Sequence, residues 1–223
     1  MRTDIFLVGA SGLARETAEA VAAGHSYRVA GVLDDDEATW GSRCGGHHVL
    51  GGIEVAAAHP RAGVVLCVGR GRVRHSIARR LQMLGTDDRR YATVIHPTAS
   101  IGATSSVGAG SIILAGVVIT ADVTVGLHVV VMPGAVLTHD DVVADFATVC
   151  AGVTLAGGVT VGFEAYVGAS SAVREGLTVG PAATIGMGAA VVRDVPAGET
   201  WVGTPARALR AASRPTSLRG EPS

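Results

Sequence analysis

The sequence predicts an α/β N-terminal Rossmann-like domain followed by a left-handed parallel β-helix of hexapeptide repeats. Two observations lead to this prediction. From Ile101 to Val191, every sixth residue is Ile, Val or Leu, with no break in phase. In the preceding region, short apolar segments alternate with segments of helical spacing, which is the pattern of a parallel sheet whose strands are joined by helices.

The six-residue period fits neither a helix, which repeats every 3.6 residues, nor a single strand, which repeats every two. It fits a coil with three flat faces, in which each face contributes one short strand. The repeated aliphatic side chain then points to the axis of the coil, and glycine often follows it, as a tight corner requires. We call these inward residues the ladder. They are Ile101, Val107, Ile113, Ile119, Val125, Val131, Leu137, Val143, Val149, Leu155, Val161, Val167, Val173, Val179, Ile185 and Val191.

The N-terminal region, residues 1–94, reads as a small parallel α/β domain. Gly24 should end its first helix, and the segment at 38–59 is irregular apart from one short helix. In order, we expect a strand at 5–9, a helix from about residue 12, a strand at 29–33, a short helix at 54–58, a strand at 64–69, a helix at 70–84 and a last strand at 91–95.

The β-helix is expected over residues 95–203. An open end of such a coil exposes unpaired strand edges, so we expect a cap after it. The segment 204–212 has the composition of a short capping helix, and 213–223 has that of a disordered tail.

Composition limits the classes of function. Apolar residues make up 48% of the chain but aromatic residues only 4%, which suits a narrow core of Val, Ile and Ala. The net charge of −1 gives no indication of binding to nucleic acid or to an anionic membrane. Three scattered cysteines suit a reducing compartment, and we see no signal peptide or long apolar run. We therefore expect a soluble cytoplasmic protein without a metal cofactor.

The ends of three expected strands carry groups that suit a nucleotide. Gly9, Ser11 and Gly12 place free N–H groups and a hydroxyl at the start of a helix, which favours phosphate. Asp34 and Asp35 end the second strand, where carboxylates can accept from a ribose or a base. Gly69 and Arg70 end the third, and Arg70, Arg72 or Arg74 could meet a phosphate. The spacing matches neither GxGxxG nor a P-loop, so a tight turn with solvated acidic loops is the alternative.

His139 and Asp140 interrupt the otherwise charge-poor β-helix. His139 follows the ladder residue Leu137 by two positions, which places it facing outward near a corner. A histidine there can act as a general base, and the next carboxylate can orient the ring and raise its basicity. The alternative is a histidine on a solvated surface. His96 and His128 do not complete a three-histidine metal site with it, so no metal is expected.

These motifs resemble a known family. A Gly-Ala-Ser-Gly turn at 9–12, a Leu-Asp-Asp strand end at 33–35, a Val-Gly end at 68–69, the His-Asp pair and a terminal Val-Gly-Thr-Pro-Ala-Arg at 202–207 are similar to those of certain bacterial sugar acetyltransferases. The group comprises sialic acid O-acetyltransferases and nucleotide-linked amino-sugar N-acetyltransferases, which are hexapeptide-repeat acyltransferases. The resemblance covers residues 4 to about 210.

The resemblance implies a homotrimer that binds acetyl-CoA, the acetyl donor, between neighbouring β-helices. It implies that His139 is the general base and that Asp140 increases its basicity. The nucleotide-linked amino sugar would then contact the N-terminal domain. The positions that match are Ser11, Gly12, Leu13, Asp34, Asp35 and Gly69 for the nucleotide sugar, and Ala169 and Met187 for acetyl-CoA.

Several positions depart from the family pattern, among them Met132 and Pro133, which stand where an Asn-Thr pair usually precedes the base. Asp141 stands where many relatives have cysteine, and Thr148 stands where many have a second histidine that touches the cofactor. We therefore count Thr148 among the cofactor positions. The leading hypothesis is N-acetylation of a nucleotide-linked amino sugar. The alternatives are O-acetylation of a sugar or sialic acid, and a non-catalytic β-helix that binds a nucleotide sugar or a partner protein.

Overall fold

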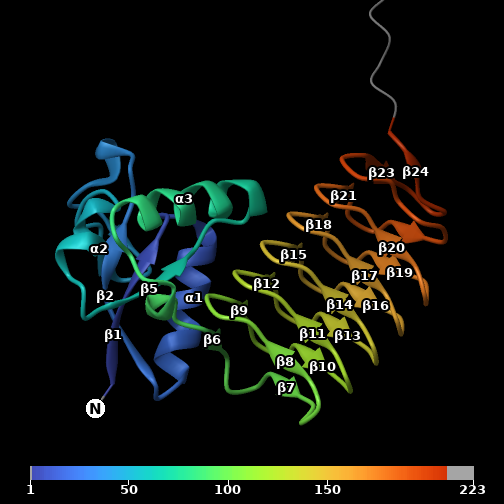
Figure 1. Ribbon diagram of the computed structural model, residues 1–223, viewed down its shortest axis with the longest axis horizontal. Coiled ribbons are helices and arrows are strands. Elements are labelled where there is room, and N and C mark those ends of the chain that lie inside the picture. Colours follow the sequence, from blue (N-terminus) through green and yellow to red (C-terminus); the bar gives the residue numbers. More distant parts are fainter. Residues whose placement is uncertain (1, 210–223) are drawn as a thin grey trace, which may run out of the picture.

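In the computed structural model, which describes residues 2–209, the six-residue period becomes a left-handed parallel β-helix with three flat faces (Figure 1). Strands on each face pair in parallel with the strand one turn, or 18 residues, further along, as Val125 does with Val143. Ladder residues from Ile113 to Val191 point inward and are buried. This confirms the predicted fold class.

The three faces are named by their order in the chain. The first face contains β6 (Val94–Ile95), β9 (Ile112–Ile113), β12 (Val130–Val131), β15 (Thr148–Val149), β18 (Tyr166–Val167), β21 (Thr184–Ile185), β23 (Thr200–Val202) and β24 (Arg207–Ala208). The second contains β7 (Ser100–Ile101), β10 (Val118–Ile119), β13 (Val136–Leu137), β16 (Thr154–Leu155), β19 (Ala172–Val173) and β22 (Ala190–Val191). The third contains β8 (Ser106–Val107), β11 (Thr124–Val125), β14 (Val142–Val143), β17 (Thr160–Val161) and β20 (Thr178–Val179).

The N-terminal domain is built on a three-stranded parallel sheet with the strand order β2-β1-β5. Helix α1 covers the side of this sheet that faces the β-helix, and α2 and α3 cover the other side. Its elements are β1 (Thr3–Val8), α1 (Gly12–Ala23), β2 (Tyr27–Leu33), a hairpin of β3 (Arg43–Cys44) and β4 (His47–His48), α2 (Glu54–Ala58), β5 (Gly63–Leu66) and α3 (Gly71–Met83). Single-turn 3-10 helices occupy Glu37–Thr39 and Asp88–Arg90.

Two expected elements differ. The strand predicted at 91–95 is shorter, because Ala92 N–H donates to Val64 and Val94 N–H then donates to Ser111, so the chain passes from the sheet into the β-helix. The capping helix predicted at 204–212 is wrong for residues 204–209, which form a turn and the strand β24. Residues 210–223, including the expected tail, lie outside the described residues.

The cap is a strand because its backbone closes the open edge. Arg207 pairs antiparallel with Val202, and Ala206 N–H donates to the carbonyl of Ala190 on the preceding turn. These bonds satisfy edge groups that a helix would leave unpaired.

The two domains share one buried interface along the first face. The outward residues of this face, Ile112, Val130 and Thr148, are fully buried, whereas Thr124 and Val142 on the third face are exposed. Ile112 and Val130 belong to the same apolar cluster as helix α1. The β-helix therefore holds the N-terminal sheet in a fixed position. None of the helices within residues 2–209 is both long and apolar enough to cross a membrane.

Candidate active site

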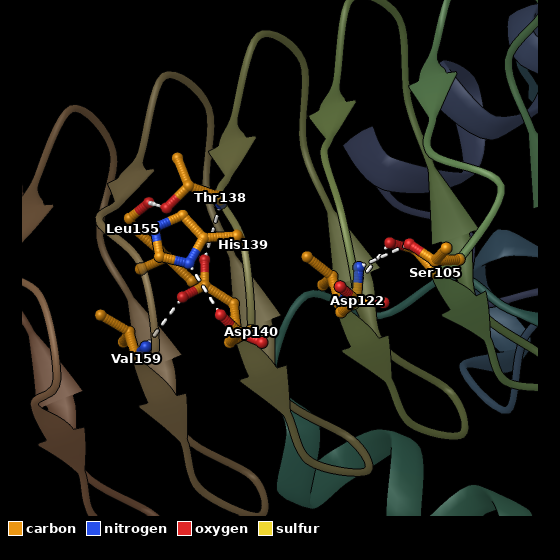
Figure 2. A network of polar contacts seen from close by, with 10 residues as sticks. Ser105, Asp122, Thr138, His139, Asp140, Leu155 and Val159 are labelled. Carbon is orange, nitrogen blue, oxygen red and sulfur yellow. Dashed lines mark hydrogen bonds and ion pairs between the residues drawn. The ribbon is translucent and has the colours of Figure 1, made fainter.

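His139 and Asp140 form a hydrogen-bonded pair on a corner of the β-helix. The corner joins β13 to β14, and the imidazole Nδ1 lies 2.8 Å from Asp140 Oδ2 (Figure 2). Both side chains are about two-thirds exposed, at 69% and 66%. With a proton on Nδ1 facing the carboxylate, Nε2 is left as a proton acceptor. The pair thus has the geometry of a general base that solvent or a substrate can reach.

The imidazole lies against the next turn of the coil. A Cβ atom added at Gly157 would come 2.3 Å from His139 Nε2, so the ring occupies space that only glycine leaves free. The backbone N–H of Gly158 donates to the carbonyl of His139, and Asp140 N–H donates to Ala121. These bonds connect the corner to the turns on either side of it.

Asp141 is a buried carboxylate beside this pair. Its side chain accepts the backbone N–H groups of Thr138 and Val159, each at 2.8 Å. Burial raises the pKa of Asp141 to about 6, although the two N–H groups and His139 oppose the shift. Sequence reasoning noted Asp141 only as a departure from the family pattern. The other turns place Ala, Ser, Val or Leu at the equivalent inward position, so a carboxylate there was the signal that sequence reasoning could have used.

The ends of β1, β2 and β5 converge on a crevice of about 270 Å³ in the N-terminal domain. Since β2 and β5 lie on opposite sides of β1, this crevice sits where the strand order reverses, which is the usual ligand position in such sheets. Of the predicted residues, Gly9, Asp34 and Asp35 line it. Arg80 from α3 also lines it and pairs with Asp35; sequence reasoning missed this arginine.

The carboxylates of the crevice are partly engaged. Asp34 accepts the backbone N–H groups of Ala10 at 2.6 Å and of Asp36 at 2.9 Å, which fixes the turn after β1. Asp35 accepts from Arg80 and from the N–H of Ile53. Asp34 is therefore mainly a support for the turn, whereas Asp35 and Arg80 present an ion pair at the mouth of the crevice.

The turn at the start of α1 differs from the predicted phosphate cradle. The hydroxyl of Ser11 donates to the carbonyl of Cys67 at 2.7 Å and accepts from Ala14 N–H, so it is already used as a helix cap. The side chain of Leu13 is buried in the core. Within the described residues, the backbone N–H groups of Gly12 and Leu13 have no protein acceptor, so the backbone alone is free for an anion.

Gly69 and Arg70 lie at the junction of the two domains instead of in the crevice. Arg70 stands over the ring of Tyr166 from β18, with its guanidinium carbon 5.8 Å from the ring centre. Both residues line a cleft of about 210 Å³ between α3 and the first face. The carbonyl of Gly69 accepts the hydroxyl of Thr148 at 2.8 Å. Thr148 is fully buried, so in this chain its side chain joins the two domains and has no free surface for a cofactor.

Ala169 and Met187 occupy a different corner from His139. They follow β18 and β21 and stack in one column, with the N–H of Gly188 donating to the carbonyl of Ala169. Met187 is 81% exposed, and Ala169 is partly buried. Their column lies between the first and second faces, and His139 lies between the second and third. A single chain therefore does not bring these residues together.

His128 is a buried residue of the interface. Its ring stacks on Phe146 at 4.8 Å and meets Tyr91 edge to face. Burial lowers its pKa to about 4, so the ring is neutral near pH 7. Among the described residues, no group of three or more His, Cys, Asp or Glu side chains is arranged to hold a metal ion.

This fold and this site define a hexapeptide-repeat acyltransferase with an N-terminal α/β domain. Residues 4–81 match the family model of the PglD N-terminal domain. The whole chain is similar to perosamine N-acetyltransferase from Caulobacter crescentus, solved as a histidine variant with CoA and GDP-perosamine, at 27% identity and a TM-score of 0.85 over 93% of this chain and 97% of that one. It is also similar to the acetyltransferase domain of PglB from Neisseria gonorrhoeae, at 29% identity and a TM-score of 0.83 over 93% and 100% of the two chains.

The N-terminal domain thus matches the PglD N-terminal family, and the whole chain is similar in structure to hexapeptide-repeat sugar acetyltransferases. WeeI from Acinetobacter baumannii, at 22% identity and a TM-score of 0.73, shares the fold. A comparison with curated proteins found no match.

Proposed function

We propose that this protein transfers an acetyl group from acetyl-CoA to the amine of a nucleotide-linked amino sugar, with His139 as the general base. The observation that carries the proposal is the His139–Asp140 pair, exposed on a rigid corner of a chain that matches sugar N-acetyltransferases over both domains. The similar structures from Caulobacter crescentus contain CoA and GDP-perosamine, an amino sugar on a nucleoside diphosphate.

The reaction requires little more than positioning and proton transfer, because a thioester is already activated. The lone pair of the sugar amine attacks the thioester carbonyl carbon, and the amine proton passes to His139 Nε2. When the tetrahedral intermediate collapses, the C–S bond breaks and the CoA thiolate takes that proton. Asp140 stabilises the imidazolium in between. Neither a metal nor a covalent acyl-enzyme is part of this scheme.

The nucleotide is assigned to the crevice of the N-terminal domain. Asp35 and Arg80 can bind the base or ribose at its mouth, and the free N–H groups of Gly12 and Leu13 offer an anion site nearby. Gly9 keeps the turn between them open, because any side chain there would collide with Val68.

Acetyl-CoA is assigned to a groove between neighbouring copies in a homotrimer. Ala169 and Met187 lie on a corner away from His139 in the same chain. A cofactor that reaches both this corner and His139 would therefore use the corner of one copy and the base of another. Thr148 is left out of this site because it is buried. We place the protein in the cytoplasm, where both substrates occur and the free cysteines stay reduced.

A thiol-release assay tests the proposal. Acetyl-CoA is supplied with UDP-, GDP-, dTDP- and CMP-linked amino sugars, beginning with a GDP-linked one such as GDP-perosamine. Wild type should release CoA with at least one of them, and His139→Asn should lower kcat by about 10²- to 10⁴-fold, the contribution of a general base. Equal melting temperatures of the two proteins exclude misfolding as the cause.

Two other outcomes have definite meanings. Acetylated product that carries an ester instead of an amide would establish O-acetylation. Nucleotide sugars that raise the melting temperature without any CoA release would favour a binding module, because only a ligand of the folded state raises that midpoint. Undiminished turnover by His139→Asn would contradict the assignment of the base.

A further inference from the structure

The corner that carries His139 breaks a backbone hydrogen-bond pattern that the rest of the β-helix follows. At the other ladder residues from Ile101 to Ile185, the residue that follows donates its N–H to the carbonyl of the residue that pairs with the ladder residue one turn later. Thr120 donates in this way to Leu137 at 3.0 Å, and Ala144 donates to Val161 at 2.8 Å. This bond fixes each corner to the turn below it.

Thr138 is the exception within this range. Its N–H donates to the Asp141 carboxylate at 2.8 Å, and its hydroxyl takes over the bond to the carbonyl of Leu155 at 3.0 Å (Figure 2). The Thr138 N–H and the Leu155 carbonyl both keep a hydrogen-bond partner, but the bond to the next turn is now made by the Thr138 side chain. The peptide before His139 is therefore bonded to Asp141 of the same corner instead of to the next turn.

Asp141 stands in the column of Ser105, two turns away. Ser105 accepts the N–H of Val123 from the next turn at 3.0 Å, and Asp141 accepts that of Val159 at 2.8 Å. A serine has one side-chain oxygen for this bond. The second oxygen of the carboxylate is what reaches Thr138.

The residues between Thr138 and Asp141 are the exposed pair, His139 and Asp140. The backbone of this corner is held at both ends by one buried carboxylate, and the imidazole extends from it over Gly157. The direction of the ring depends on the orientation of the peptide that Thr138 and Asp141 set.

We propose that Thr138 and Asp141 are positioning residues for His139. Because the Thr138 N–H donates to Asp141 and the Thr138 hydroxyl replaces it at the Leu155 carbonyl, the peptide before His139 is oriented so that the imidazole lies over Gly157. This inference rests on the proposed role of His139 as the base. It assigns a purpose to the buried aspartate at 141 and to the threonine before the base.

The Asp141→Ser variant distinguishes the role of Asp141 in positioning Thr138 from its role in holding the next turn of the β-helix. The serine can keep the bond to Val159, as Ser105 does with Val123, but it cannot hold Thr138 as well. We expect kcat to fall about 10- to 100-fold, the effect of a displacement near 1 Å, with both KM values within about twofold of wild type. Ser105→Ala removes the equivalent bond two turns away and should leave kcat within about twofold.

Threonine 138 gives a second, independent pair of variants. Thr138→Ser keeps the hydroxyl and should retain activity, whereas Thr138→Val removes it and should lower kcat to the same extent as Asp141→Ser. If Asp141→Ser fails to fold, this pair decides the question. Equal kcat values for Asp141→Ser and Ser105→Ala, or for the two Thr138 variants, would overturn the proposal while the role of His139 stands.

A crystal structure of Asp141→Ser provides a readout that does not depend on activity. We expect Thr138 N–H to return to the Leu155 carbonyl and the imidazole to leave Gly157. A ring that stays over Gly157 would overturn the proposal even if wild type acetylates no sugar, so this experiment separates its failure from that of the proposed function.

Discussion

The guanidinium of Arg74 donates to the carbonyl of Phe146 at 2.7 Å, across the interface between helix α3 and the β-helix. Arg74 is 1% exposed and has no carboxylate partner within hydrogen-bond reach in the described structure. All of its bonds go to backbone carbonyls, those of Val68, Gly69, His128, Phe146 and Ala147. Burial lowers its pKa to about 10, so it remains charged near pH 7.

Arg74→Met should therefore loosen the two domains. The variant keeps apolar volume but leaves buried carbonyls without a donor, which costs about 1–3 kcal/mol for each unsatisfied group. Three of the five carbonyls, those of Val68, His128 and Phe146, have no other donor in the described structure, so we expect a total loss of about 3–9 kcal/mol in the free energy of unfolding. Urea denaturation measures it, and Arg79→Met, on the exposed side of the same helix, should change it by less than about 0.5 kcal/mol. Equal stabilities of the two variants would refute the role of Arg74.

Gly9→Ala should close the crevice of the N-terminal domain. Gly9 has a φ of +104°, and a Cβ there would lie 2.7 Å from Val68 Cγ2 and 3.0 Å from the carbonyl of Cys67. Gly41→Ala is a matched control, because its φ is +77° but nothing lies within 4 Å of the new Cβ. We expect about 1 kcal/mol of destabilisation in the control from backbone conformation and more in Gly9→Ala.

Ligand binding provides the sharper test of this glycine. A nucleotide sugar that raises the melting temperature of wild type should raise that of Gly41→Ala equally and that of Gly9→Ala little or not at all. Undiminished stabilisation of Gly9→Ala would place the nucleotide elsewhere.

The sequence was sufficient to predict the fold because the ladder residues repeat without a phase break, and each inward residue has the same environment. The interface could not be predicted in the same way, because the outward Val130 is buried in it whereas the outward Val142 on the third face is exposed. The capping helix was predicted wrongly, since alanine-rich composition favours helix, whereas the open edge at Ala190 demanded a strand.

The site was less predictable, since sequence patterns do not reveal which polar groups are already engaged. Ser11 was expected to donate to a phosphate, but its hydroxyl donates to the backbone carbonyl of Cys67. Thr148 was expected at the cofactor and lies in the interface. Arg74 was a candidate for a phosphate contact, but it lies buried in the interface, where its spacing from Gly71 and Leu81 on the buried stripe of α3 puts it. By contrast, His139 was found because it interrupts an apolar pattern.

His128 should make the protein sensitive to acid. Its pKa is lowered to about 4 in the folded state, below the usual 6.5, because burial and the nearby Arg74 disfavour its charged form. The contribution of neutral His128 to the free energy of unfolding is thus fully present above pH 6.5. It is lost as pH falls through 4, by about 3 kcal/mol for a shift of this size. Urea unfolding between pH 7 and pH 4 should show a smaller decline in the free energy of unfolding for His128→Phe than for wild type. Phenylalanine suits this position because Phe146, one turn later, has the same left-handed backbone conformation.

Asp141 should change the pH dependence of stability in the opposite direction to His128 over the same pH range. Burial raises its folded pKa to about 6, above the ordinary 3.8, although Thr138, Val159 and His139 favour its charge and Asp140 does not. Its contribution is therefore greatest at low pH and is lost as pH rises through 6, by up to about 3 kcal/mol. The difference in unfolding free energy between Asp141→Ser and wild type should thus favour the variant more at pH 7 than at pH 4.5. A difference independent of pH would show that Asp141 does not titrate in this window.

Gly157→Ala should impair the base without unfolding the protein. The new Cβ would fall 2.3 Å from His139 Nε2 and Cε1, the outer atoms of an exposed ring that can rotate away, so the strain is relieved by moving the base. We expect kcat to fall about 10- to 100-fold, while the free energy of unfolding changes by less than about 1 kcal/mol. A double-mutant cycle identifies the cause: in a His139→Asn background, Gly157→Ala should lower the residual rate much less, because there is no base left to displace. Equal losses in both backgrounds would mean that Gly157 acts on acetyl transfer independently of His139.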